Sequence, residues 1–146
     1  RDDRLEVGRA VGADETVNVK TENLVEKVRD ATDGHMIDVV VEAVGKPSVW
    51  YDIMSIVAPR ARVAMTGLFA GETCEVDFDP IVINNVSILG CLGSPSLWDE
   101  AISLHERGLV SSEPLITHRL PLSDFAEAVE IVRERRDGAI KAVLHP

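Results

Sequence analysis

The chain has 146 residues, of which 45% are hydrophobic and 27% are charged, as in an ordinary globular domain. Its 25 acidic and 15 basic residues give a formal net charge of −10, which argues against nonspecific binding to nucleic acid or to anionic membranes. The sequence shows no apolar run near the roughly 18 residues of a membrane span and no signal peptide. Its cysteines, Cys74 and Cys91, are isolated, so we expect a reduced, cytoplasmic protein.

The first third of the chain predicts a helix, a weak strand and a second helix. Asp3 is expected to cap the first helix, which ends at Gly12. The short alternating stretch Thr16–Val19 predicts the strand. Thr21 is expected to cap the second helix, whose apolar residues recur at helical spacing.

The strongest strand signal is Ile37–Gly45, which reads Ile-Asp-Val-Val-Val-Glu-Ala-Val-Gly. Its β-branched residues with few polar breaks predict a strand that is covered on both faces. A glycine turn ends it, and Ser48 is expected to cap a helix that closes at Pro59-Arg60. A strand, a tight glycine turn and a helix N-terminus form a common ligand-facing corner in parallel α/β sheets. An ordinary buried strand is the alternative interpretation.

Two more strands are expected after this corner. They are Arg62–Gly67 and Val86–Leu92, and each carries a glycine near its carboxyl end. Residues 73–85 between them, with Pro80, are the least regular part of the chain. A helix is expected from Pro95 to Gly108. Alternating helices and strands predict an α/β fold with a parallel sheet.

The pattern changes after Gly108. Leu115–Leu120 predicts a strand, Ser123 is expected to cap a helix with Phe125 turned inward, and Ala139–Leu144 predicts an edge strand. This strand–helix–strand tail is a candidate for a separate sheet.

The sequence contains no GxGxxG, no phosphate-binding P-loop and no zinc-ligand spacing, and its histidines are scattered. Asp38 and Glu42 lie on one face of the predicted strand, which would suit an acid/base pair. We favour a role for Glu42 in orienting backbone or ligand groups. Gly45, Gly67 and Gly90 each close a strand, and a residue without Cβ lets a ligand approach the backbone at this edge.

Five segments, taken in order, are specific as a set: Arg4–Asp14, Ile37–Gly45, Arg62–Gly67, Pro114–Arg119 and Gly138–Leu144. Together they resemble the medium-chain, zinc-type alcohol dehydrogenase family, most closely its polyol, butanediol and threonine dehydrogenase branch. The resemblance covers nearly the whole chain. It implies a partial Rossmann-type, doubly wound parallel sheet over residues 1–113. Residues 114–146 would be a C-terminal segment that in the family returns to the catalytic domain.

The resemblance also implies a function. The chain would be the C-terminal cofactor-binding part of an oxidoreductase that positions the nicotinamide of NAD or NADP for hydride transfer from an alcohol. The family's GxGxxG turn and zinc ligands have no counterpart in these residues, so zinc belongs to the parent enzyme and we expect the chain alone to be inactive. The alternative is a truncated, non-catalytic α/β domain that binds nucleotide weakly or only self-associates.

Ten cofactor-binding positions follow from the resemblance, whereas no catalytic residue and no metal ligand does. They are Val44, Gly45, Lys46, Thr66, Gly67, Leu68, Gly90, Cys91, Leu92 and Lys141. In family terms, residues 44–46 lie near the adenosine, residues 66–68 beside the nicotinamide, residues 90–92 at its carboxamide, and residue 141 reaches the pyrophosphate. Residue 141 has an alternative interpretation as a solvated edge-strand lysine. The resemblance also implies a homodimer or homotetramer with Val86–Leu92 at the subunit contact.

Overall fold

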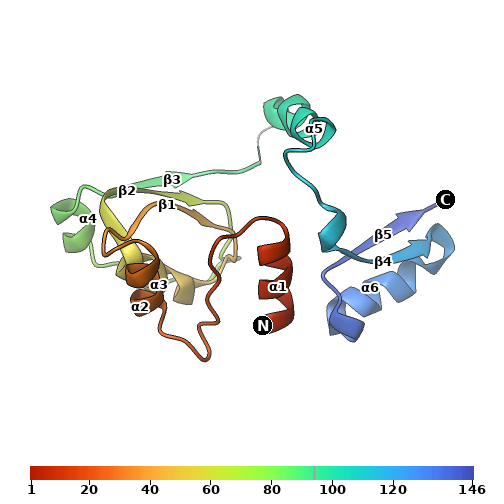
Figure 1. Ribbon diagram of the computed structural model, residues 1–146, viewed down its shortest axis with the longest axis horizontal. Coiled ribbons are helices and arrows are strands. Elements are labelled where there is room, and N and C mark those ends of the chain that lie inside the picture. Colours follow the sequence, from red (N-terminus) through yellow and green to blue (C-terminus); the bar gives the residue numbers. More distant parts are fainter. Residues whose placement is uncertain (94) are drawn as a thin grey trace. The chain divides into compact units, whose positions relative to one another are not determined.

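The computed structural model describes residues 1–93 and 95–146, and it divides them into two compact units (Figure 1). One unit is Val19–Leu97, and the other combines Arg1–Asn18 with Trp98–Pro146. Among the residues described, no helix has both the length and the apolar character that a membrane span requires.

The unit Val19–Leu97 is built on a parallel sheet, as the sequence predicts. Its strands are β1 (Ile37–Glu42), β2 (Val57–Met65) and β3 (Ser87–Gly90), in the spatial order β1-β2-β3. Its helices are α2 (Leu24–Ala31), α3 (Pro47–Ile56) and α4 (Asp79–Ile83), and a 3-10 turn covers Pro95–Leu97. The α/β, Rossmann-type expectation is therefore confirmed for this unit.

The core of this unit lies on one face of the sheet. Ile53 of α3, Val63 of β2 and Val86 form a buried cluster, around which partly buried hydrophobic residues pack. Removal of apolar surface from water is the main term that stabilises such a cluster. The helices therefore fix the sheet from this face, and the carboxyl ends of the strands stay free for a site.

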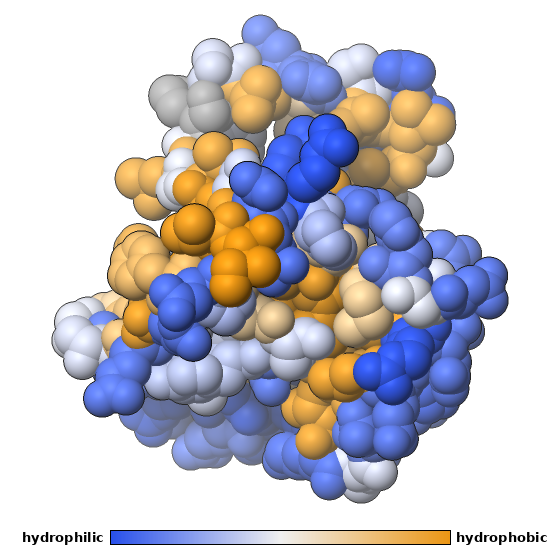
Figure 2. Space-filling model, turned by 90° about the vertical axis from the view of Figure 1, so that its left-hand side faces the viewer, coloured by the Kyte–Doolittle hydropathy of each residue, from blue (hydrophilic) through white to orange (hydrophobic). Residues whose placement is uncertain are grey.

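The opposite face of β1 is open to solvent in the described residues. Val39 and Val41 are 51% and 64% exposed. The prediction that this strand is covered on both faces is therefore wrong here, because β1 has one strand neighbour and one helix-covered face. On the face of the molecule drawn in Figure 2, hydrophobic patches are visible between hydrophilic residues.

The first two predicted caps are not the caps. Asp3 lies inside α1 (Asp2–Ala10), where the Arg1 guanidinium donates to its carboxylate and lowers its pKa. The N-cap of α2 is Asn23, whose side-chain oxygen accepts from the Glu26 amide at 3.2 Å, and not Thr21. Asn23 lies three residues before that amide, the spacing at which a cap oxygen reaches an orphan N–H.

The other two predicted caps are also wrong. Pro47 occupies the first turn of α3, because its fixed φ suits that position, so Ser48 lies inside the helix. Ser123 lies in a 3-10 turn, and Asp124 is the N-cap residue of α6. The N-cap of α3 is Lys46, two residues before the predicted cap, and the N-cap of α6 is one residue after the predicted cap, both within the usual variation of helix ends.

The weak strand predicted at Thr16–Val19 does not form. The Arg9 guanidinium donates to the Thr16 hydroxyl, and the Asn18 side-chain amide donates to Asp2 at 2.8 Å. These polar side chains bind α1, so the segment is held as irregular chain.

The boundaries near β2 differ from the prediction in one further respect. The helix ends at Ile56, before Pro59, and the strand begins at once. The register with β1 jumps between the pairs Ile37↔Val57 and Val39↔Arg62. Proline has no N–H for a strand ladder, which accounts for the irregularity. Pro80, in the segment predicted to be irregular, lies in the first turn of α4.

The second unit contains a separate two-stranded parallel sheet, as expected for the tail. Its elements are α1, α5 (Trp98–Glu106), β4 (Ile116–Pro121), α6 (Phe125–Glu134) and β5 (Lys141–His145), with 3-10 turns at Glu113–Leu115, Leu122–Asp124 and Arg136–Gly138. Helix α6 packs on this sheet through Ala128 and Ile131, whereas Phe125, predicted to face inward, is exposed.

Candidate functional site

The three strands of the larger sheet end at one level. Glu42 pairs with Met65, and Met65 pairs with Gly90, so the last residues of β1 and β3 flank the last residue of β2. The chain segments that leave these ends include nine of the ten predicted cofactor positions. The carboxyl edge of a parallel sheet is where α/β proteins bind ligands.

Glu42 is the polar centre of this edge. Its side chain is buried, with 2% exposure. Oxygen Oε1 accepts from the Val44 and Gly45 amides, each at 2.7 Å, and Oε2 accepts from the Gly67 amide at 3.2 Å. Its main-chain carbonyl accepts from the Thr66 amide at 2.8 Å, from the Thr66 hydroxyl at 2.7 Å and from the Gly67 amide at 3.1 Å. The interpretation that Glu42 orients backbone groups is confirmed.

The alternative acid/base pair does not form. Asp38 lies on the surface, where its carboxylate is 3.0 Å from the exposed ring of His35. The Glu42 carboxylate is occupied by main-chain amides. Two carboxyl groups that share acid and base roles must both reach a reacting atom, and this geometry gives them different partners.

Two of the three edge glycines, Gly45 and Gly67, allow the turns after β1 and β2 to come into contact. A Cβ added to Gly67 would lie 2.3 Å from the nitrogen of Gly45. A Cβ added to Gly45, which has φ +69°, would lie 2.6 Å from the carbonyl oxygen of Leu68. These positions need glycine because two backbones touch there. At Gly90 an added Cβ would meet nothing within 4 Å, so that glycine faces open space.

A cavity of about 480 Å³ opens beside β2 and β3 at this edge. Its lining residues are Thr66, Gly90, Cys91, Leu92, Gly93 and Leu97. It thus brings together four of the predicted cofactor positions from two separate strand ends. The Cys91 amide donates to the Met65 carbonyl at 2.9 Å, which holds this segment against β2. Gly93 and Leu97 were missed, since the family motifs stop before them.

The remaining predicted positions of this unit do not line this cavity. The Lys46 ammonium group is 2.9 Å from the Glu72 carboxylate, and both side chains are exposed. Val44 and Leu68 are exposed hydrophobic residues. An exposed ion pair of this kind is worth about 0–1 kcal/mol, so the Lys46–Glu72 pair contributes little to stability.

Lys141 lies in the other unit. It lines a cavity of about 370 Å³ together with Ser112, Leu115, Ile116 and Val143. The structure therefore groups nine predicted positions in one unit, and the place of Lys141 in the cofactor site stays a prediction.

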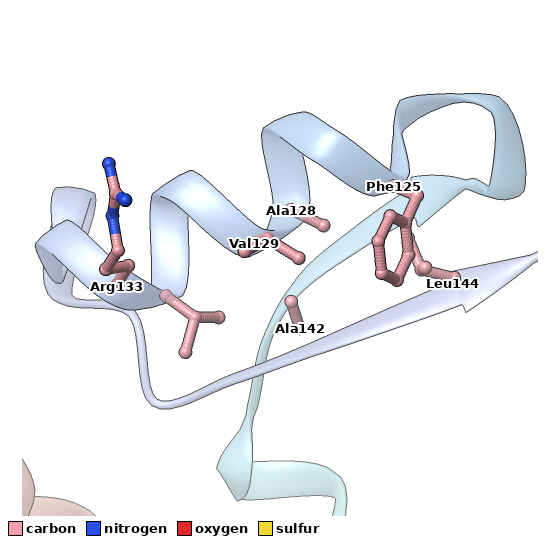
Figure 3. Close-up of a pocket in the computed structure, with 7 residues that line it drawn as sticks. Phe125, Ala128, Val129, Arg133, Ala142 and Leu144 are labelled. Carbon is pink, nitrogen blue, oxygen red and sulfur yellow. The ribbon is translucent and has the colours of Figure 1, made fainter.

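A second hollow in that unit, the α6 groove, is apolar. Phe125 and Val129 of α6 face Ala142 and Leu144 of β5 across it (Figure 3). Val132 also lines the groove, and Arg133 is its one charged residue. A nucleotide site needs several polar groups to orient the ligand, which this groove does not supply. It contains none of the predicted site residues.

Metal ligands do not gather in the part of the chain that the structure describes. No three His, Cys, Asp or Glu side chains among residues 1–93 and 95–146 are placed to hold a metal ion. Cys74 and Cys91 are both free thiols.

Comparison with known proteins gives one family. The pattern of the family described as zinc-binding dehydrogenase matches residues 1–107. An L-threonine 3-dehydrogenase from Pyrococcus horikoshii is 32% identical, over 98% of this chain and 42% of its own length. A sorbitol dehydrogenase from Halalkalibacterium halodurans is 28% identical, over 98% of this chain and 41% of its own length. The chain therefore spans about two fifths of these relatives.

Solved structures agree with this result. A protein described as a short chain alcohol dehydrogenase from Escherichia coli CFT073, solved with the cofactor NADH, is 26% identical and superimposes with a TM-score of 0.89. The match covers 100% of this chain and 42% of that one. The alcohol dehydrogenase TADH from Thermus sp. ATN1 gives the same TM-score at 25% identity, with the same coverage.

Proposed function

Because the chain belongs to the zinc-binding dehydrogenase family, we propose that it is the C-terminal cofactor-binding part of an NAD(P)-dependent alcohol or polyol dehydrogenase. The observation that carries the proposal is the cavity at the carboxyl edge, which unites Thr66 with Gly90, Cys91 and Leu92. The NADH complex of a structural relative supports the choice of cofactor.

The lining of this cavity suits a nicotinamide ring. Gly90 presents no side chain toward open space, so a flat ring has room to approach the backbone there. Leucines supply apolar surface, and Thr66 lies at the junction with β2. When bound, the nicotinamide would accept a hydride from the alcohol carbon. The residues of this chain bind and orient the ring, while the turn of residues 44–46 would contact the adenosine and Lys141 the pyrophosphate.

Filling the space at Gly90 tests this proposal. In the natural protein that contains this chain, Gly90→Val should weaken NADH binding by at least about tenfold, because the new side chain occupies the space proposed for the ring. The fold should persist, since nothing lies within 4 Å of the added Cβ. The dissociation constant is measured by calorimetric titration with NADH.

The control is Ser87→Val, which adds a similar side chain to an exposed position on the same strand, outside the cavity. It should leave the dissociation constant unchanged. Equal affinity of Gly90→Val and the unaltered protein, or no NADH binding by the unaltered protein, would refute the proposal. In the latter case self-association without nucleotide binding would be the better account.

Residues 1–146 alone are expected to turn over no alcohol, because the residues described here gather no metal site beside the proposed cofactor cavity. The measurement is NAD or NADP reduction in the presence of zinc and a panel of secondary alcohols and polyols. A rate clearly above the no-protein control would show that this expectation is wrong.

The partner proposed for the chain is a second copy, in contact with Val86–Leu92. Strand β3 is an edge of its sheet, and Ile88 and Leu89 on it are exposed hydrophobic residues. Ile88→Lys should weaken association, because a charge on an edge strand opposes further pairing. Val39→Lys is the control and should leave association unchanged, since it places the same charge on the other edge strand, β1. A monomer before the change, or the same oligomer after it, in sedimentation velocity would contradict this proposal.

A further inference from the structure

We propose that Glu42 is a positioning residue. It holds in place the main chain that borders the cofactor cavity, and it does not touch the cofactor. This inference rests on the proposed function. It starts from one observation: a single buried carboxylate binds the main chain of two turns that are more than twenty residues apart, at Gly45 and Gly67.

Each of the two carboxylate oxygens accepts hydrogen bonds from a different turn. Oε1 accepts from Val44 and Gly45 in the turn after β1, and Oε2 accepts from Gly67 in the turn after β2. A carboxylate can accept at both oxygens and has no donor that would oppose an amide. The exposed Lys46–Glu72 pair also joins these turns, but it does so in water, where it contributes little.

The close contact between the two glycine turns brings their amides to the same carboxylate. Gly45 and Gly67 meet backbone to backbone, and their amide groups both point to Glu42. Without the carboxylate, the Val44 and Gly45 amides would lose their acceptor, which is costly, and the Gly67 amide would keep only the Glu42 carbonyl, at 3.1 Å. The carboxylate therefore strengthens the packing of the two turns.

The link from Glu42 to the cavity runs through Thr66. Its amide and its hydroxyl both donate to the Glu42 carbonyl, and it lines the cavity. Gly67, the next residue, is held by the Glu42 carboxylate. A shift of the second turn would move Thr66 relative to Gly90, its neighbour across the cavity. Preorganised sites lose affinity when their supporting contacts are loosened.

Glu42→Gln separates this positioning role from simple packing. Glutamine has the same shape, and its carbonyl oxygen can still accept from Val44 and Gly45. Its amide nitrogen then faces the Gly67 amide, donor against donor. NADH affinity should fall by about tenfold, with binding stoichiometry retained at a temperature where the variant is folded. Asp38→Asn, which removes an exposed carboxylate on the same strand away from the cofactor positions, is the control and should change the affinity less than twofold.

A spectroscopic signature distinguishes positioning from general loss of stability. In ¹⁵N-labelled protein, Glu42→Gln should move the Gly67 amide proton upfield, while Val44 and Gly45 keep their resonances near the original positions. Unchanged NADH affinity, or an unmoved Gly67 resonance, would overturn the role of Glu42. If the unaltered protein does not bind NADH, both the proposed function and the positioning role of Glu42 are refuted. If NADH binds but the Gly67 resonance does not move in Glu42→Gln, only the positioning role is refuted.

If Glu42→Gln does not fold, amide hydrogen exchange of the unaltered protein tests the role of Glu42 instead. The amides of Val44 and Gly45 should then be protected, because both donate to the Glu42 carboxylate, whereas the Gly67 amide also donates to the Glu42 carbonyl at 3.1 Å. Fast exchange of the Val44 and Gly45 amides would overturn the proposal.

Discussion

Gly67→Ala is expected to lower the free energy of unfolding by about 2–4 kcal/mol, the range of severe backbone and packing conflicts. Its Cβ would lie 2.3 Å from the Gly45 nitrogen and 2.5 Å from Oε2 of Glu42. Neither neighbour can yield easily, because one is main chain and the other is a buried carboxylate bound to two further amides. Urea unfolding followed by circular dichroism measures the change.

Gly90→Ala is the matched control for this prediction. It lies at the same edge of the sheet, and nothing lies within 4 Å of the Cβ that it adds. We expect its unfolding midpoint to stay close to that of the unaltered protein. If Gly67→Ala were as stable as Gly90→Ala, the close packing of the two glycine turns would be wrong.

The second large effect is expected in the core. Ile53→Ala should cost about 2–5 kcal/mol, because it leaves a cavity against Val63 and Val86. Ile83→Ala removes the same atoms from a helix position that is 75% exposed, whereas Ile53 is 4% exposed. It should therefore change the unfolding midpoint little. Equal losses for the two variants in urea unfolding would show that the cluster does not form the core of this unit.

The hydrophobic pattern predicted the strands that form, but it also predicted one at Thr16–Val19 that does not form, and it did not predict what surrounds each strand. The run of β-branched residues at β1 is confirmed as a strand, and its parallel pairing with β2 follows from the helix between them. Its open face could not be predicted, because burial depends on which elements are present as neighbours. The N-cap of α2 was mispredicted for a local reason: Thr21 and Asn23 are both good N-cap residues, so propensity alone does not choose between them.

The candidate site was predictable in part. Glycines at strand ends pointed to the carboxyl edge, and the structure places Gly45, Gly67 and Gly90 there. The sequence does not reveal that the first two touch each other while the third faces open space, since those distances are set by tertiary packing. The shared contacts of Glu42 were hidden for the same reason, because residues 42 and 67 are far apart along the chain.

The most direct test of the account is to map the cofactor by NMR on the ¹⁵N-labelled natural protein. On titration with NADH, we expect the largest amide shift changes at Thr66, Gly90, Cys91 and Leu92, which line the cavity at the carboxyl edge. The α6 groove, represented by Val129, should show none. Shift changes confined to the α6 groove, or spread without a maximum at the carboxyl edge, would contradict the proposed cofactor site.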